Sequence, residues 1–165
     1  HGCFRSRART RAAFDALADS RASLARVLDT PDIELPGGRD GWSTLLEQTQ
    51  AVLDGREAAL DAQRAAASVR ELTPQLLAAA ANVAKSAGPA RAEALAPYLE
   101  RFELRAQAIE QDLSAFADGT APVETAARRL SDSLVFMGQF VSAVNGEQNA
   151  LGIAALPASG ISCPG

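Results

Sequence analysis

Apolar residues recur at alternating steps of four and three positions in two segments of the second half of the chain, which begin at Leu95 and Val123. This spacing puts one continuous apolar stripe along one side of an α-helix, as in rods that pack nearly parallel to a neighbour. We therefore expect two amphipathic helices that lie antiparallel and pack against each other. The stripe residues are Leu95, Leu99, Phe102, Ala106, Ile109, Leu113 and Phe116 in the first segment and Val123, Ala127, Leu130, Leu134, Met137, Val141 and Val144 in the second.

A helix is also expected over about residues 6–29, where apolar residues share one stripe that Arg21 interrupts. Pro31 and residues 35–41 follow it and are too rich in helix breakers for regular structure. The stripe of this helix consists of Phe14, Leu17, Leu24 and Leu28.

The longest predicted helix covers about residues 41–86, where apolar residues come as doublets every seven positions. Two apolar positions per heptad make a wide stripe that is able to face two neighbouring helices. Pro74 lies inside this region, and a proline removes a backbone donor and clashes with the preceding turn. We therefore expect a kink or a break near residue 74, with Thr73 capping the restarted helix. The doublets are Leu45-Leu46, Val52-Leu53, Ala59-Leu60 and Ala66-Ala67.

Together these patterns predict an all-α fold, namely an antiparallel up-down four-helix bundle with a long, Pro-kinked second helix. Its helices cover about residues 6–29, 41–86, 89–117 and 122–146, and residues 147–165 form a tail. A chain of 165 residues suits a single helical-bundle module over residues 1–165.

The composition agrees with this fold, because alanine supplies much of the 47% hydrophobic content and favours helix. The net charge of −4 argues against nucleic acid as a partner, since nucleic acid rewards a basic face. No segment approaches the roughly 18 uninterrupted apolar residues of a membrane span. The N-terminus also lacks the pattern of a signal peptide. We expect a module that is soluble as it stands, which is also compatible with a piece of a longer, membrane-anchored protein.

Cys3 and Cys163 lie near opposite ends of the chain. An even number of antiparallel helices brings both chain ends to the same end of a bundle, so a disulfide between them is one interpretation. Two unrelated thiols are the other. A bridge would indicate an oxidising compartment.

Catalytic and metal chemistry find little support. His1 is the single histidine, whereas di-iron sites in helical bundles combine several inward glutamates with paired Glu-x-x-His motifs. A nucleophile elbow, a phosphate loop and a dinucleotide fingerprint are all missing. We predict a non-enzymatic protein that needs no cofactor and no metal.

Arg101 and Arg105 lie four residues apart, on one helix face beside the apolar stripe. Two guanidinium groups in this arrangement are able to hold a small anion or a partner's carboxylate through paired hydrogen bonds. Pairing within the helix, with Glu100, Glu103 or their neighbours, is the simpler interpretation.

Phe136 and Phe140 lie off the main stripe of the last helix, four residues apart on one flank. Either that helix is central and buried on two sides, or the flank is a docking surface for a partner. Burial is the favoured interpretation, and both residues are kept as candidate partner contacts.

Three segments resemble the periplasmic sensory domain of the PilJ family, the chemoreceptor-like (methyl-accepting) proteins of type IV pilus systems. They are residues 71–76 (ELTPQL), 128–140 (RRLSDSLVFMGQF) and 144–153 (VNGEQNALGI). The spacing of the Gly88-Pro89 and Asp118-Gly119 turns is also similar. The resemblance spans about residues 13–153.

The resemblance implies a helical bundle that senses a stimulus in the periplasm, as part of a protein anchored in the inner membrane. It implies signalling through a cytoplasmic methyl-accepting region to a chemotaxis adaptor and a histidine kinase that control twitching motility. The major pilin is the implied partner, and the implied receptor is a homodimer.

The third predicted helix departs from this family in one stretch. Members usually carry a box rich in glutamine and arginine there, which is related to small-anion sensing. The corresponding residues 98–105 (YLERFELR) keep Arg101 and Arg105, with Tyr98 beside them, but lack the glutamines and contain acids. Tyr98, Arg101 and Arg105 remain the candidate ligand-binding residues, and the departure favours protein contact over a small ligand.

Overall fold

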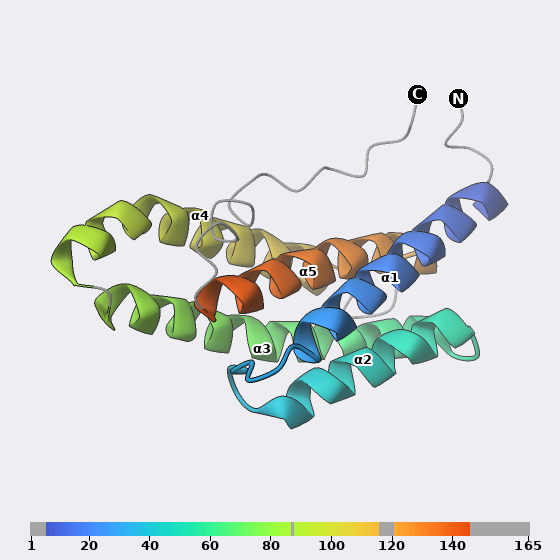
Figure 1. Cartoon of the computed structure of the whole chain (residues 1–165). Coiled ribbons are helices and arrows are strands. Elements are labelled where there is room, and N and C mark those ends of the chain that lie inside the picture. Colours follow the sequence, from blue (N-terminus) through green and yellow to red (C-terminus); the bar gives the residue numbers. More distant parts are fainter. Residues whose placement is uncertain (1–5, 87, 116–120, 146–165) are drawn as a thin grey trace.

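The computed structural model describes the backbone of residues 6–86, 88–115 and 121–145. These residues form five α-helices, and none of them lies in a strand (Figure 1). The all-α prediction is confirmed, whereas the predicted number of four helices is wrong. The helices are α1 (Ser6–Leu28), α2 (Arg39–Asp54), α3 (Ala58–Ser86), α4 (Pro89–Ser114) and α5 (Val123–Val144).

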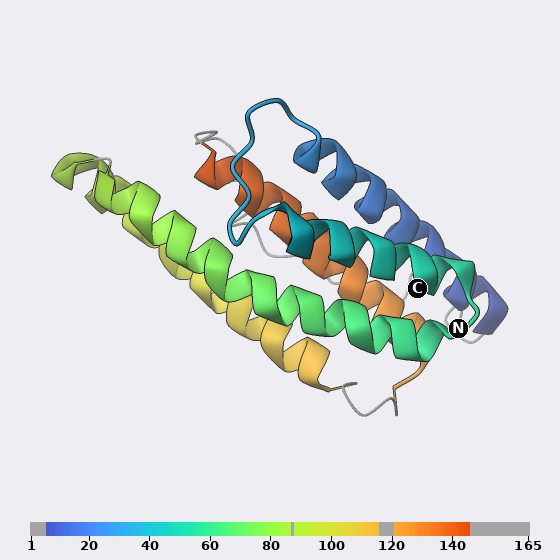
Figure 2. The same ribbon diagram turned by 90° about the horizontal axis from the view of Figure 1, so that it is seen from below.

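The predicted long second helix is two helices, α2 and α3, that lie side by side (Figures 1 and 2). The chain turns at Gly55, whose φ of 78° is in the left-handed region and whose N–H bonds back to the carbonyls of Ala51 and Val52. A glycine in this conformation ends a helix without steric cost. The apolar doublets keep their seven-residue spacing across this turn, although the chain changes direction there. Leu60, in the first doublet after the turn, is therefore exposed.

Pro74 lies inside α3 and does not interrupt it, so a break of the helix near residue 74 is wrong. The pyrrolidine ring lies on the exposed side of the helix. The Thr73 hydroxyl does not cap a restarted helix; it donates to the carbonyl of Val69, 2.7 Å away, within the continuous helix. Tertiary packing of α3 on its neighbours therefore outweighs the local preference of proline.

Helices α3 and α5 are the central helices of the bundle, since each of them contacts three others. In both views α1 and α5 lie side by side and run in the same direction, while α2 and α4 run the opposite way (Figures 1 and 2). Helix α5 contacts α1, α3 and α4, and α3 contacts α2, α4 and α5. The predicted contact between α4 and α5 is present, but α4 packs mainly on α3, and α5 packs mainly on α1 and α3.

The predicted apolar stripes do face the core. Ile109 of α4 is 3% exposed and Met137 of α5 is fully buried. Arg21 interrupts the stripe of α1 because its Nε donates to the backbone carbonyl of Leu46 in α2, 2.9 Å away. The stripe residues that are buried in the described part include Leu17, Leu24, Leu28, Phe102, Ala106, Leu113, Ala127, Leu130, Leu134 and Val141.

The bundle has a step at one end. The α3–α4 hairpin extends beyond the ends of α1, α2 and α5 (Figure 2).

None of the helices in the described part of the chain is long and apolar enough to cross a membrane. Cys3 and Cys163 lie outside the described residues. Because the helices number five, the even-number argument for a disulfide between the chain ends does not apply.

Candidate functional site on the α4–α5 face

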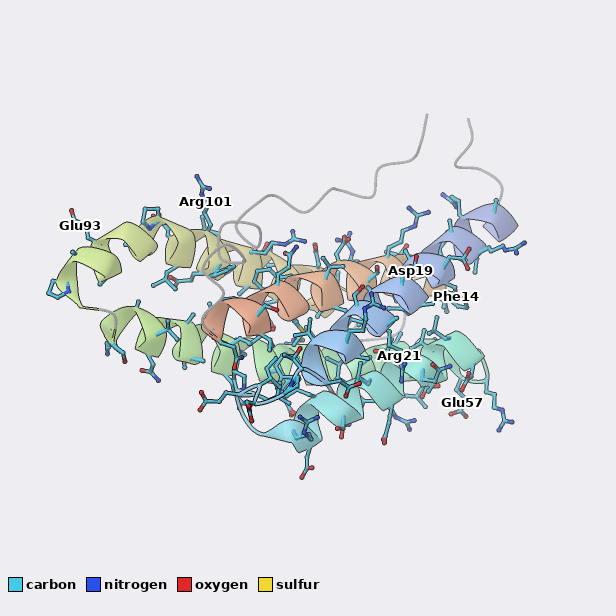
Figure 3. All side chains as sticks on the ribbon, in the orientation of Figure 1. Phe14, Asp19, Arg21, Glu57, Glu93 and Arg101 are labelled. Atoms are coloured by element: carbon cyan, nitrogen blue, oxygen red, sulfur yellow. The ribbon has the colours of Figure 1, made fainter. Side chains whose placement is uncertain are left out.

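The two predicted anion-binding arginines lie on α4 in different environments. Arg101 is exposed and its side chain extends away from the other helices (Figure 3). Arg105, one turn later, is half-buried. Tyr98 belongs to α4 as well, but its side chain lies outside the described part of the structure.

Arg105 lies beside α5 rather than beside the acids of its own helix. Its positive charge acts on the carboxylate of Asp132, as do the charges of Arg128 and Arg129. Arg129 also forms an ion pair with Asp112 of α4, with Nη1 and Oδ1 2.7 Å apart. We call Arg105, Asp112, Arg128, Arg129 and Asp132 the α4–α5 charged face. The ion pairs between described residues do not include Arg101 or Arg105, so the predicted pairing with Glu100 or Glu103 is wrong.

Asp132 is the titratable group at the centre of this face. Burial raises its pKa, because the half-buried carboxylate loses part of its hydration, and the negative charge of Asp112 acts in the same direction. The positive charges of Arg105, Arg129 and Arg128 oppose the shift. Since the Arg105 guanidinium already faces a carboxylate, it is poorly placed to hold a free anion. Arg101 is the arginine of the pair that remains open to a partner.

Phe136 and Phe140 are buried, which confirms the favoured interpretation that α5 is central, and neither ring is exposed for contact with a partner. Phe136 is 3% exposed and Phe140 is fully buried. The ring of Phe140 stacks on Phe102 of α4 with the ring centroids 3.8 Å apart, and the ring of Phe136 meets both others edge-on. Their flank is occupied because α5 is central and packs on α4 as well as on α1 and α3.

Polar contacts join α5 to α1 along their shared length. The Ser131 hydroxyl donates to the carbonyl of Ala16, 3.0 Å away, and Arg9 forms an ion pair with Glu124 at 3.1 Å. A methyl group at Gly138 would lie 3.7 Å from Leu24, so the two helices approach closely at this glycine. Sequence analysis missed these contacts, although the small residues at positions 131 and 138 were a signal for close helix approach.

Asn145 ties the end of α5 to the loop between α1 and α2. Its Oδ1 accepts the backbone N–H of Glu34 at 2.7 Å, and its Nδ2 donates to the carbonyl of Glu34 at 2.9 Å. The same Nδ2 donates to Val141 at 2.8 Å within α5. The contact borders a cavity of about 630 Å³ where the loop meets α3 and the end of α5. Asn145 lies in one of the segments that carry the family resemblance.

Among the described residues, no group of three or more His, Cys, Asp or Glu side chains lies close enough together to hold a metal ion. Among the carboxylates of the α4–α5 charged face, Asp112 is paired with Arg129, and Asp132 is influenced by the positive charges of Arg105, Arg129 and Arg128.

Comparisons of this chain with known protein families, with curated proteins and with solved structures find no match. The functional assignment therefore depends on the residues and the geometry of this chain.

Proposed function

We propose that this chain is a non-enzymatic sensory module of the PilJ type, which binds the major pilin in the periplasm and passes the signal through its helix packing. The observation that carries the proposal is the place of residues 128–140, the longest segment of the resemblance. They lie in α5, the helix that contacts α1, α3 and α4. A change of packing at α5 would reach three other helices directly.

The polar contacts of α5 give this helix a defined position. Ser131 bonds to Ala16 of α1, and Arg129 pairs with Asp112 of α4. Each contact is directional, so a shift of α5 along its axis would break it. A partner that binds one packing of α5 more tightly than another would shift the population between them, whereas equal affinity for both would change nothing.

The α4–α5 charged face is the surface that we assign to pilin contact. On α4 the exposed Arg101 lies one turn before Arg105 of this face, and Arg128 adds a guanidinium group from α5. Val135, one turn after Asp132, adds an exposed apolar side chain on α5. Arginine pairs well with carboxylates and tolerates burial in an interface. A protein surface that carries carboxylates or side-chain amides around an apolar centre fits this combination better than a small anion does.

The wider assignment follows the family resemblance. The module would belong to an inner-membrane-anchored homodimer, and its cytoplasmic methyl-accepting region would act on a chemotaxis adaptor and a histidine kinase. The output would be control of twitching motility.

Hydrogen exchange of the chain with and without the soluble domain of the major pilin tests the proposal. We expect protection over α4 and α5 and, beyond the contact face, a changed exchange rate in the α1–α2 loop that Asn145 holds. Arg101→Glu should weaken pilin binding about tenfold. Arg56→Glu, at an exposed arginine of the α2–α3 turn, makes the same charge change and should leave binding intact.

Two other results would indicate a different function. Protection confined to the contact face would indicate an adaptor bundle that assembles a complex without switching. Calorimetric binding of nitrate or a small carboxylate that is lost in the Arg101→Ala/Arg105→Ala variant would indicate a small-anion receptor. Failure of pilin to bind at all would remove the pilin-sensing function.

A further inference from the structure

A groove of about 580 Å³ lies between α3 and α4, along the flank of α4 that faces away from the α4–α5 charged face. The helices are in a register that places Arg70 opposite Glu110 and Leu77 opposite Glu103. We call this hollow the α3–α4 groove. It is separate from the surface that we assign to pilin.

The groove exists because the residues at its centre are small. Thr73 and Ala106 form part of its floor and are 6% and 5% exposed, and Ile109 closes the floor beside them at 3%. The ring of Pro74 and the half-buried side chain of Leu77 form the wall on α3. The floor and this wall are thus largely apolar and would accept an apolar side chain.

The rim of the groove on α4 carries two glutamates, one of which is paired with Arg70 of α3. Glu103 is exposed at the edge, and Glu110 closes one end through a bidentate ion pair with Arg70, with N–O distances of 2.7 and 3.0 Å. The hydrogen bonds from Arg70 lower the pKa of Glu110, so this carboxylate stays charged at neutral pH. The ion pairs between described residues leave Glu103 without a cation.

We propose that the α3–α4 groove docks a basic amphipathic helix of a partner protein, which inserts one leucine- or methionine-sized side chain between Pro74 and Ala106 and places a lysine or arginine against Glu103. The carboxylate of Glu103, unpaired among the described residues, favours a positively charged side chain, and the apolar floor favours the apolar anchor. From Arg70 to Leu77 the groove is about 10 Å long at 1.5 Å per residue, which suits one or two turns of a docked helix. This inference does not depend on the proposed sensory function.

Fluorescence anisotropy with a labelled peptide tests the proposal directly. The probe is a 14-residue amphipathic helix of leucine and lysine, titrated with the whole chain. One control peptide carries glutamate at every lysine position, and another carries glutamine at every leucine position. We expect the leucine–lysine helix to bind at least tenfold more tightly than either control at low salt, because the groove requires both the charge and the anchor.

Variants locate the binding in the groove. Glu103→Lys should weaken binding about tenfold, while Glu47→Lys on the exposed face of α2 makes the same change in net charge and should alter it less than twofold. Gln107→Trp fills the groove from an exposed lining position, and Gln50→Trp on α2 is its matched control. Thermal melts followed by circular dichroism verify that each variant folds.

Equal binding of the basic and acidic helices would overturn the proposal, as would a Gln107→Trp variant that binds like wild type. Sedimentation of the chain alone tests the remaining occupant, a second copy of itself. Self-association that Gln107→Trp abolishes would show that the groove is a dimer interface, and would also overturn the proposal.

Discussion

The side chain of Asn145 pairs with both backbone polar groups of Glu34, a residue that lies 111 positions earlier in the chain. The amide of one asparagine thereby joins the end of α5 to the loop between α1 and α2. The same loop is held from the other side by Trp42, whose indole N–H donates to the carbonyl of Pro36 at 3.0 Å. The loop is therefore fixed by two side chains from two different helices.

Replacing Asn145 should release the loop without unfolding the bundle. We expect Asn145→Ala to lower the free energy of unfolding by about 1–2 kcal/mol, because it removes two exposed hydrogen bonds to Glu34 and a part-buried one to the carbonyl of Val141. Backbone amides of the α1–α2 loop should exchange faster, whereas amides in α3 keep their wild-type protection. Asn145→Asp keeps the acceptor and loses the donor, and its effect should be intermediate. Unchanged exchange in the loop of Asn145→Ala would contradict the assigned role.

The three stacked phenylalanines make a second prediction. Phe140→Ala should destabilise the protein by about 3–5 kcal/mol, since it removes a fully buried ring that packs on Phe102 and Phe136. Phe14→Ala is the control, because Phe14 is only half-buried and should cost clearly less. Urea unfolding at one temperature measures both. A Phe140→Ala variant as stable as wild type would place this ring on the surface.

The fold class and the buried face of each helix could be predicted from the sequence, because helical periodicity is a local property. Ile109 and Met137 are buried as the 4-3 spacing indicates. The turn at Gly55 was missed for a related reason. The apolar doublets keep their seven-residue spacing across it, so the pattern predicts one continuous helix although Asp54-Gly55 is able to end one.

The choice of neighbours could not be predicted in this way. Every helix carries a stripe of similar alanine and leucine residues, so periodicity does not say that α5 packs on α1 more than on α4. The charged neighbours of Arg105 depend on the register between two helices. Asp132 is 27 positions away in the sequence, and no local pattern links the two.

Pro74 gives a third prediction, because the structure places it inside a continuous helix. Pro74→Ala restores an N–H that is able to bond to the Arg70 carbonyl and removes a steric conflict with the preceding turn. We expect it to stabilise the protein by about 1–2 kcal/mol in urea unfolding, less than the full proline penalty of about 3 kcal/mol, because α3 has already adapted to the ring. A break at residue 74 would give the opposite sign, since the variant would then disturb a native turn.

The raised pKa of Asp132 leads to a prediction about pH. A carboxyl group whose pKa is higher in the folded than in the unfolded state binds protons more tightly when folded, so stability falls as pH rises from the ordinary aspartate value to the folded one. Asp132→Asn removes this decline. Relative to wild type, the variant should therefore gain stability as pH rises from about 3 to 7, as measured by calorimetric melts at a series of pH values.

Arg105→Gln should raise the pKa of Asp132 further, because it removes a positive charge that opposes the shift. A carbon-detected NMR titration of the Asp132 carboxyl measures that pKa in both proteins, and a lower value in Arg105→Gln would contradict the proposed electrostatic contact.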